Sequence, residues 1–103
     1  MSNTARQVMH VVLLQWNPGT APETVERAFE ELRALKGKIP GIMELTCGAN
    51  FTDRARGYTH GLVVLFTDRA ALEVYLPHPE HQRVVQEFIN PIRADALALD
   101  YEI

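Results

Sequence analysis

The chain has 103 residues, of which 47% are hydrophobic and 22% charged, and a formal net charge of −3. This composition is typical of one compact domain over residues 1–103 and excludes a disordered chain. The acidic balance, without a basic cluster, argues against a nucleic-acid partner. No apolar run approaches the ~18 residues of a membrane span, and Met1–Gln7 lacks the apolar core of a signal peptide. Because Cys47 is the single cysteine, no internal disulfide can form, and we expect a cytoplasmic protein.

The first predicted element is a strand from Met9 to Trp16. Most of its odd-numbered and even-numbered positions are apolar, so both faces of this strand should be covered. An amphipathic helix follows and runs to about Lys36. Its start carries Thr20 and Glu23 at the spacing of a capping box.

A second strand is predicted from Ile42 to Cys47 and a third from Tyr58 to Phe66, the third again apolar on both faces. A short helix capped by Thr67 or Asp68 comes next, and it carries Tyr75. A further helix from Pro79 to about Ile89 and a last strand from Ala96 to Ile103 complete the pattern.

The order β-α-β-β-α-β predicts an α+β ferredoxin-like subunit, with an antiparallel four-stranded sheet covered by helices on one face. An antiparallel sheet with a single helical layer normally has a polar outer face. The apolar outer positions therefore predict a homodimer through the sheet face, which would make a dimeric α/β barrel.

The segment from Tyr75 to His81 joins the two last helices and holds three ionisable groups. Pro77 cannot continue the helix before it, whereas Pro79 suits a first helical turn. His78 is then the N-cap, and His81 lies in the opening turn beside unpaired backbone N–H groups. These donors favour a neutral imidazole, which is the form that a base requires.

Several motifs are spread over the chain, namely His10-Val11-Val12-Leu13, Leu35 with Ile39-Pro40-Gly41, Gly48, Gly57-Tyr58-Thr59-His60, Tyr75-Leu76-Pro77-His78-Pro79-Glu80-His81 and Asp100-Tyr101. With these motifs the chain resembles the stress-responsive A/B-barrel (Dabb) family from His10 to Glu102. The resemblance implies a dimeric α/β barrel of ferredoxin-like subunits. In a plant polyketide cyclase of this family, a Tyr and a His matching Tyr75 and His81 serve an aldol-type cyclisation without a cofactor.

Tyr75 and His81 are the candidate catalytic residues. His81 would act as a general base beside a carbonyl, and Tyr75 would donate to the developing enolate oxygen. Alternatively, the two side chains bond each other or the backbone and only lock the hinge. The candidate substrate-binding residues for a small apolar carbonyl compound are His10, Phe29, His60, Leu62, Leu72 and His78.

The histidines also allow a metal site to be considered, because His78 and His81 have HxxH spacing. No carboxylate has obvious ligand spacing beside them, so we predict no metal. His10 and His60 lie on apolar strand faces and are expected to be hydrogen-bonded core histidines. They start at opposite ends of an antiparallel strand pair, which argues against direct contact between them.

These observations lead to two functional hypotheses. The first is a cofactor-free acid–base enzyme of the cyclase or isomerase type, and the second is a non-catalytic stress-response or ligand-binding module. A cavity that reaches both Tyr75 and His81 would favour the enzyme. Cys47 is expected to be a small buried hydrophobe rather than a nucleophile.

Overall fold

The computed structural model describes residues 5–103. Residues 1–4 lie outside this range. The prediction that Met1–Gln7 is not a signal peptide therefore falls partly outside the described residues. The elements in chain order are β1 (Val8–Trp16), α1 (Pro22–Ala34), η1 (Leu35–Gly37), β2 (Ile42–Ala49), β3 (His60–Phe66), α2 (Arg69–Tyr75), α3 (Pro79–Val84), η2 (Val85–Ile89) and β4 (Arg93–Glu102). Here η1 is a 3₁₀ turn that extends α1, and η2 is a π-helical turn that extends α3. Within residues 5–103 we find no helix with both the length and the apolar character that crossing a membrane requires.

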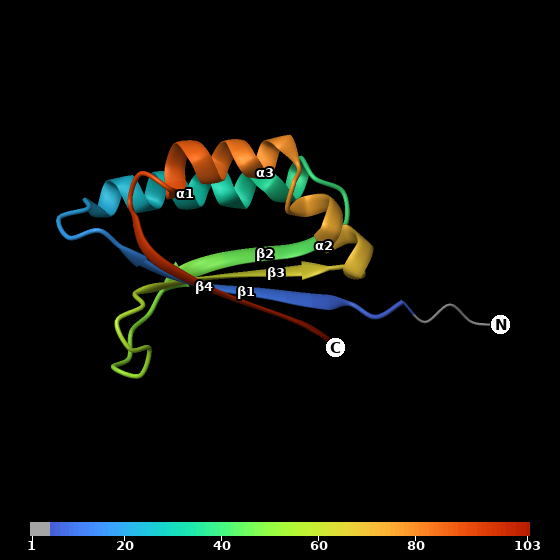
Figure 1. Cartoon of the computed structure of the whole chain (residues 1–103), viewed down its shortest axis with the longest axis horizontal. Helices are drawn as coiled ribbons and strands as arrows, with labels where there is room; N and C mark the ends of the chain where they lie inside the picture. The colour runs from blue at the N-terminus through green and yellow to red at the C-terminus, as the bar shows by residue number, and fades with distance from the viewer. Residues whose placement is uncertain (1–4) are drawn as a thin grey trace.

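The four strands form one antiparallel sheet in the order β2-β3-β1-β4. Helices α1 and α3 lie side by side over one face of this sheet, α2 lies near one end, and no element of residues 5–103 covers the opposite face (Figure 1). The predicted ferredoxin-like fold is therefore confirmed.

The core lies between the sheet and the helices. On α1 the buried side chains are Val25, Ala28, Phe29 and Leu32, and their helical spacing agrees with the predicted amphipathic helix. From the sheet, Val64 and Phe66 are completely buried in the same core cluster. Burial of each large apolar side chain contributes about 1.5–3 kcal/mol, so this layer holds α1 in place over β1 and β3.

The predicted capping box at the start of α1 is wrong. The residue before the helix is Ala21, and no side chain caps it. The Thr20 hydroxyl instead donates to the Asn17 carbonyl at 2.7 Å, which closes the preceding turn. Pro22 starts the helix, where its missing N–H costs nothing. For α2, by contrast, the predicted cap is confirmed, because the Asp68 carboxylate accepts from the backbone N–H of Ala71 at 2.9 Å.

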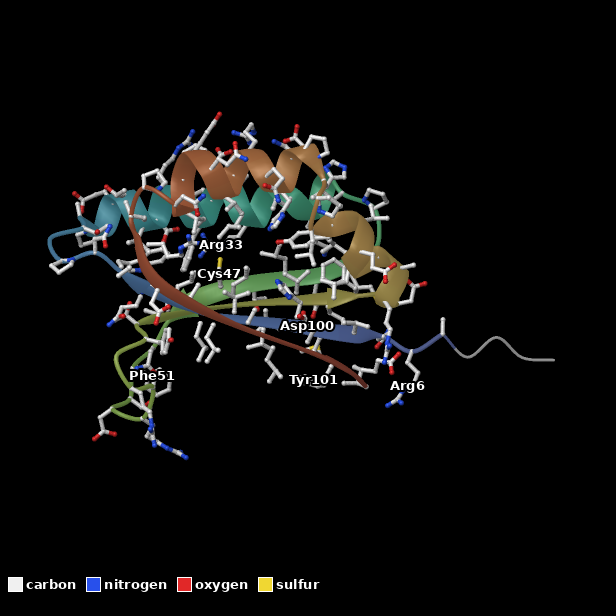
Figure 2. The ribbon with its side chains drawn as sticks, viewed as in Figure 1. Arg6, Arg33, Cys47, Phe51, Asp100 and Tyr101 are labelled. Carbon is white, nitrogen blue, oxygen red and sulfur yellow. The ribbon has the colours of Figure 1, made fainter. Side chains whose placement is uncertain are left out.

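The uncovered face of the sheet is apolar across three strands. Each row on this face has one residue of β1 between its partners on β3 and β4. The three rows are Val11 between Val63 and Leu99, Met9 between Leu65 and Tyr101, and Leu13 between Gly61 and Leu97. On β4 the exposed fractions are 53% for Leu97, 60% for Leu99 and 45% for Tyr101. Figure 2 shows Tyr101 on the side of the sheet away from the helices. A surface of this kind normally has a partner.

Candidate functional site

The hinge between α2 and α3 is built as the sequence predicts. Helix α2 ends at Tyr75, and Pro79 occupies the first turn of α3. The His78 ring is the N-cap, because its Nδ1 accepts from the backbone N–H of Glu80 at 3.1 Å. His78 therefore serves the backbone of the hinge.

The second hinge histidine, His81, is held by the backbone through one ring nitrogen. Its Nδ1 lies 2.9 Å from the carbonyl oxygen of Leu76. Because a carbonyl only accepts, Nδ1 carries the proton, and in the neutral ring Nε2 keeps a free lone pair. Burial lowers the pKa of His81, with smaller contributions from His10 and His78, while the bond to Leu76 opposes this shift. The neutral form is thus favoured as predicted, but burial is the main cause.

Tyr75 is fully buried beside this ring. The ring centroids of Tyr75 and His81 are 4.2 Å apart. Burial also raises the pKa of Tyr75, so its phenol stays protonated. Within residues 5–103 its hydroxyl has no hydrogen-bond partner. The alternative in which both side chains lock the hinge therefore holds for His81 only. His81 bonds the backbone, whereas the Tyr75 hydroxyl has no hydrogen-bond partner in the described chain.

His10 approaches the same place from β1. It is buried, and its Nδ1 lies 2.5 Å from Oδ1 of Asp100, its cross-strand partner on β4. The carboxylate accepts, so Nδ1 carries the proton and Nε2 is directed away from Asp100. The His10 ring lies edge-on to Tyr75, with centroids 5.9 Å apart. Asp100 is a residue that sequence reasoning did not select for the site, although its place opposite His10 follows from the antiparallel register.

A cavity of about 110 Å³ brings these groups together. His10, Tyr75 and His81 line it, with Arg93 at the start of β4. The remaining walls are almost entirely apolar, and Leu62 is among them. Part of the wall comes from η2, whose π turn is closed by the Asn90 N–H donating to the Val85 carbonyl at 2.8 Å. The arrangement is an apolar pocket with two imidazoles and a phenol, which is suited to moving a proton.

Two of the predicted substrate-binding residues lie at the other end of the core. The Trp16 indole N–H donates to His60 Nδ1 at 2.9 Å, and Thr59 Oγ1 lies at 2.9 Å from the same nitrogen. Phe29 packs against His60 with centroids 5.5 Å apart. His60 pairs with Leu14 in the register, four positions from His10 along β1, so the expected lack of direct contact between the two histidines is confirmed.

Leu72 is also separate from the cavity, and it faces a different hollow at the edge of the sheet. Cys47 is partly buried beneath Arg33 of α1 (Figure 2), and burial raises the pKa of its thiol. A protonated thiol is a poor nucleophile, in agreement with the sequence prediction. Over residues 5–103, no group of three or more His, Cys, Asp or Glu side chains is arranged to hold a metal ion.

The fold and this cavity define a ferredoxin-like α+β subunit with a small, mostly apolar pocket that opens to solvent. The family described as the stress responsive A/B barrel domain (Dabb) matches residues 8–103. The chain belongs to this family, as its motifs indicate.

Individual relatives cover nearly the whole chain. The stress-response A/B barrel domain-containing protein HS1 of Arabidopsis thaliana is 25% identical over 99% of this chain and 94% of its own. A solved dimeric ferredoxin-like protein of unknown function from Jannaschia sp. CCS1 is 30% identical, covers 94% of this chain and 99% of its own, and has a TM-score of 0.80. The hydroxynitrile lyase from Passiflora edulis is 22% identical over 95% of this chain and 94% of its own, with a TM-score of 0.86. That last likeness shows the fold alone.

Proposed function

We propose that this protein is a cofactor-independent proton-transfer enzyme, of the cyclase or isomerase type, that acts on a small apolar carbonyl compound. Two observations together carry the proposal: a cavity is lined by both Tyr75 and His81, and the buried Tyr75 hydroxyl lacks a partner among residues 5–103. A buried hydroxyl without a partner costs about 1–3 kcal/mol. A ligand oxygen in the cavity would remove this cost, so the site is arranged to receive an acceptor.

The chemistry follows from the two protonation states. Neutral His81 removes a proton from the carbon next to the carbonyl through Nε2, and the electron pair of the broken C–H bond moves onto the carbonyl oxygen. Tyr75 donates a hydrogen bond to that oxygen as its negative charge develops. The imidazolium of His81 then returns the proton to a different carbon in an isomerisation, or to the new alkoxide after the enolate carbon attacks a second carbonyl group in a cyclisation.

A deuterium-exchange experiment tests this proposal. Short ketones and oxo acids are incubated with the protein in D₂O, and loss of the signals of protons next to the carbonyl is followed by NMR. The wild type is expected to exchange at least one of these compounds, and His81→Ala is expected to lose that exchange while keeping the fold and the assembly. Unfolding of His81→Ala would instead favour a structural role, and His81→Gln then separates the two roles because its side chain still fills the position.

A non-catalytic ligand-binding or stress-response module is the second candidate. The observation that favours it is the hinge itself, in which His78 caps α3 and His81 bonds the Leu76 carbonyl, so both histidines stabilise the backbone. Binding of a compound in the cavity without any proton exchange would support this second function.

We also propose a cytoplasmic homodimer that forms through the uncovered sheet face. The apolar rows on that face support it, as does Phe51, which is 95% exposed on the loop that extends to the same side (Figure 2). The similar protein from Jannaschia sp. CCS1 is described as dimeric. The free thiol of Cys47 fits a reducing compartment.

Light scattering at micromolar concentration tests the homodimer. Leu99→Arg places a charge in the middle of an apolar row and is expected to give monomers, because an unpaired charge would be buried in the interface. The matched control is Val74→Arg, a substitution of a residue 49% exposed on α2, which is expected to remain a dimer. A monomeric wild type would contradict the proposal.

A further inference from the structure

The size of the cavity limits what it can enclose. Its volume is about 110 Å³. An engineered apolar protein cavity of about 150 Å³ accommodates one benzene molecule. The enclosed part of a ligand here is therefore smaller than a six-carbon ring, on the order of four or five non-hydrogen atoms. An aromatic polyketide is too large to fit inside, and any larger ligand must extend out of the cavity.

The charges around the cavity are of one sign. Arg93 lines it, and no Asp or Glu side chain does. The carboxylate of nearby Asp100 already accepts from His10. Arg93 is exposed whereas His10 and Tyr75 are buried, so Arg93 lies on the solvent side of the cavity and the buried residues lie within.

Arg93 also differs from most arginines of this chain. Arg27, Arg33, Arg69 and Arg83 each contact a glutamate at 3.3 Å or less. None of the ion pairs or side-chain hydrogen bonds found within residues 5–103 includes Arg93. A guanidinium stays charged in proteins and presents a planar fork of N–H groups that matches a carboxylate. Its charge is therefore available to an anionic ligand.

We propose that the substrate is a short oxo acid, with its carbonyl group in the cavity against Tyr75 and His81 and its carboxylate bound by Arg93. This inference rests on the proton-transfer function proposed above, and it changes the substrate from a wholly apolar compound to one with an apolar carbonyl portion and a charged carboxylate. In a molecule such as 2-oxobutanoate, the ethyl ketone portion has about four non-hydrogen atoms and suits the enclosed volume. The carboxylate then lies at the solvent side, where it pairs with Arg93.

The experiment compares 2-oxobutanoate with 2-oxobutanamide, a neutral compound of nearly the same size. Deuterium exchange at the methylene group is measured by NMR for the wild type, Arg93→Gln and Arg54→Gln. Arg54 is the matched control, because it is an exposed arginine on the loop before β3, outside the cavity. We expect the wild type to prefer the acid. Arg93→Gln should raise KM for the acid about tenfold or more and remove this preference, because a charge-assisted hydrogen bond contributes about 1.5–3 kcal/mol. Arg54→Gln should keep it.

A binding measurement separates failure of this inference from failure of the proposed function. The ring signals of His81 are followed by NMR as each compound is added. Equal exchange of the acid and the amide, unchanged in Arg93→Gln, would overturn the oxo-acid inference and leave the proton-transfer function standing. Arg93-dependent binding of the acid without exchange would support the carboxylate site and refute proton transfer on this compound. Absence of both binding and exchange would overturn the inference.

Discussion

Two groups of polar side chains lie in the same core, one at each end of the helix-covered face, and they differ in whether a buried side-chain polar atom lacks a hydrogen-bond partner within residues 5–103. In the first group, Trp16 donates to His60, and Thr59 approaches the same ring nitrogen. In the second group, His10 and His81 each use Nδ1, but the Tyr75 hydroxyl has no partner within residues 5–103.

Burial lowers the pKa of both His60 and His81, so pKa shifts alone do not distinguish the two ends. The Tyr75 hydroxyl without a partner and the cavity that Tyr75 lines distinguish the two ends. A histidine that accepts a hydrogen bond beside aromatic rings is what packing requires, whereas a buried donor without a partner, on a residue that lines a cavity, is what ligand binding requires. We therefore expect substitutions at the two ends to separate activity from stability.

The largest difference is expected for His81. His81→Gln removes the proposed base and should lower the rate of proton exchange about 10²–10⁴-fold, which is the usual contribution of a general base. Turnover of 2-oxobutanoate and circular dichroism, measured on the same preparation, check this expectation. A variant that keeps both its fold and its rate would show that His81 is not the base, and that the Tyr75 end has no more catalytic role than the His60 end.

Tyr75→Phe should affect activity and stability in opposite directions. Loss of the donor to the enolate oxygen is expected to lower the rate about 10²–10³-fold. The same substitution removes a buried hydroxyl that lacks a partner, so the free energy of unfolding should stay constant or rise by about 1 kcal/mol. Urea denaturation measures this change. If Tyr75→Phe were strongly destabilising, the hydroxyl would have a structural partner after all.

The pH dependence of the reaction should report His81 as a base. The rate is constant where His81 is neutral, and it falls tenfold per pH unit once the ring is protonated. Because burial lowers the pKa of His81 from 6.5, the midpoint of the acidic fall in rate should lie below pH 6.5. Tyr75 causes no loss on the alkaline side before pH 10, since its pKa is raised. A profile of kcat/KM whose acidic limb lies above pH 7 would contradict this assignment.

Local rules were sufficient to predict the hinge. Pro77 and Pro79 restrict their own backbone and that of their neighbours, so the end of α2, the start of α3 and the cap by His78 could all be predicted from sequence. The capping box failed for a related reason, because Pro22 already suits the helix start and Thr20 has an alternative acceptor in the Asn17 carbonyl.

The composition of the cavity could not be predicted in the same way. Alternation along a strand shows which face a residue occupies, but it does not show how far along the sheet that residue lies relative to another element. His10 and His60 share a face and are separated by four positions of register. The contact of His10 with Asp100 joins residues 90 positions apart, and it depends on the pairing of β1 with β4.

The smallest effect on activity is expected at the end of the core that holds His60 and Trp16. His60→Leu leaves the Trp16 indole N–H without its acceptor and should lower the free energy of unfolding by about 1–2 kcal/mol. Both side chains are partly exposed, so water can replace part of the lost bond. The double variant Trp16→Phe/His60→Leu should be less destabilised than the sum of the single variants, because it leaves no unpaired donor. Proton exchange should stay within a few-fold of the wild type in all three. If His60→Leu lowered exchange as strongly as His81→Gln, the buried hydroxyl without a partner would not be the property that separates the two ends.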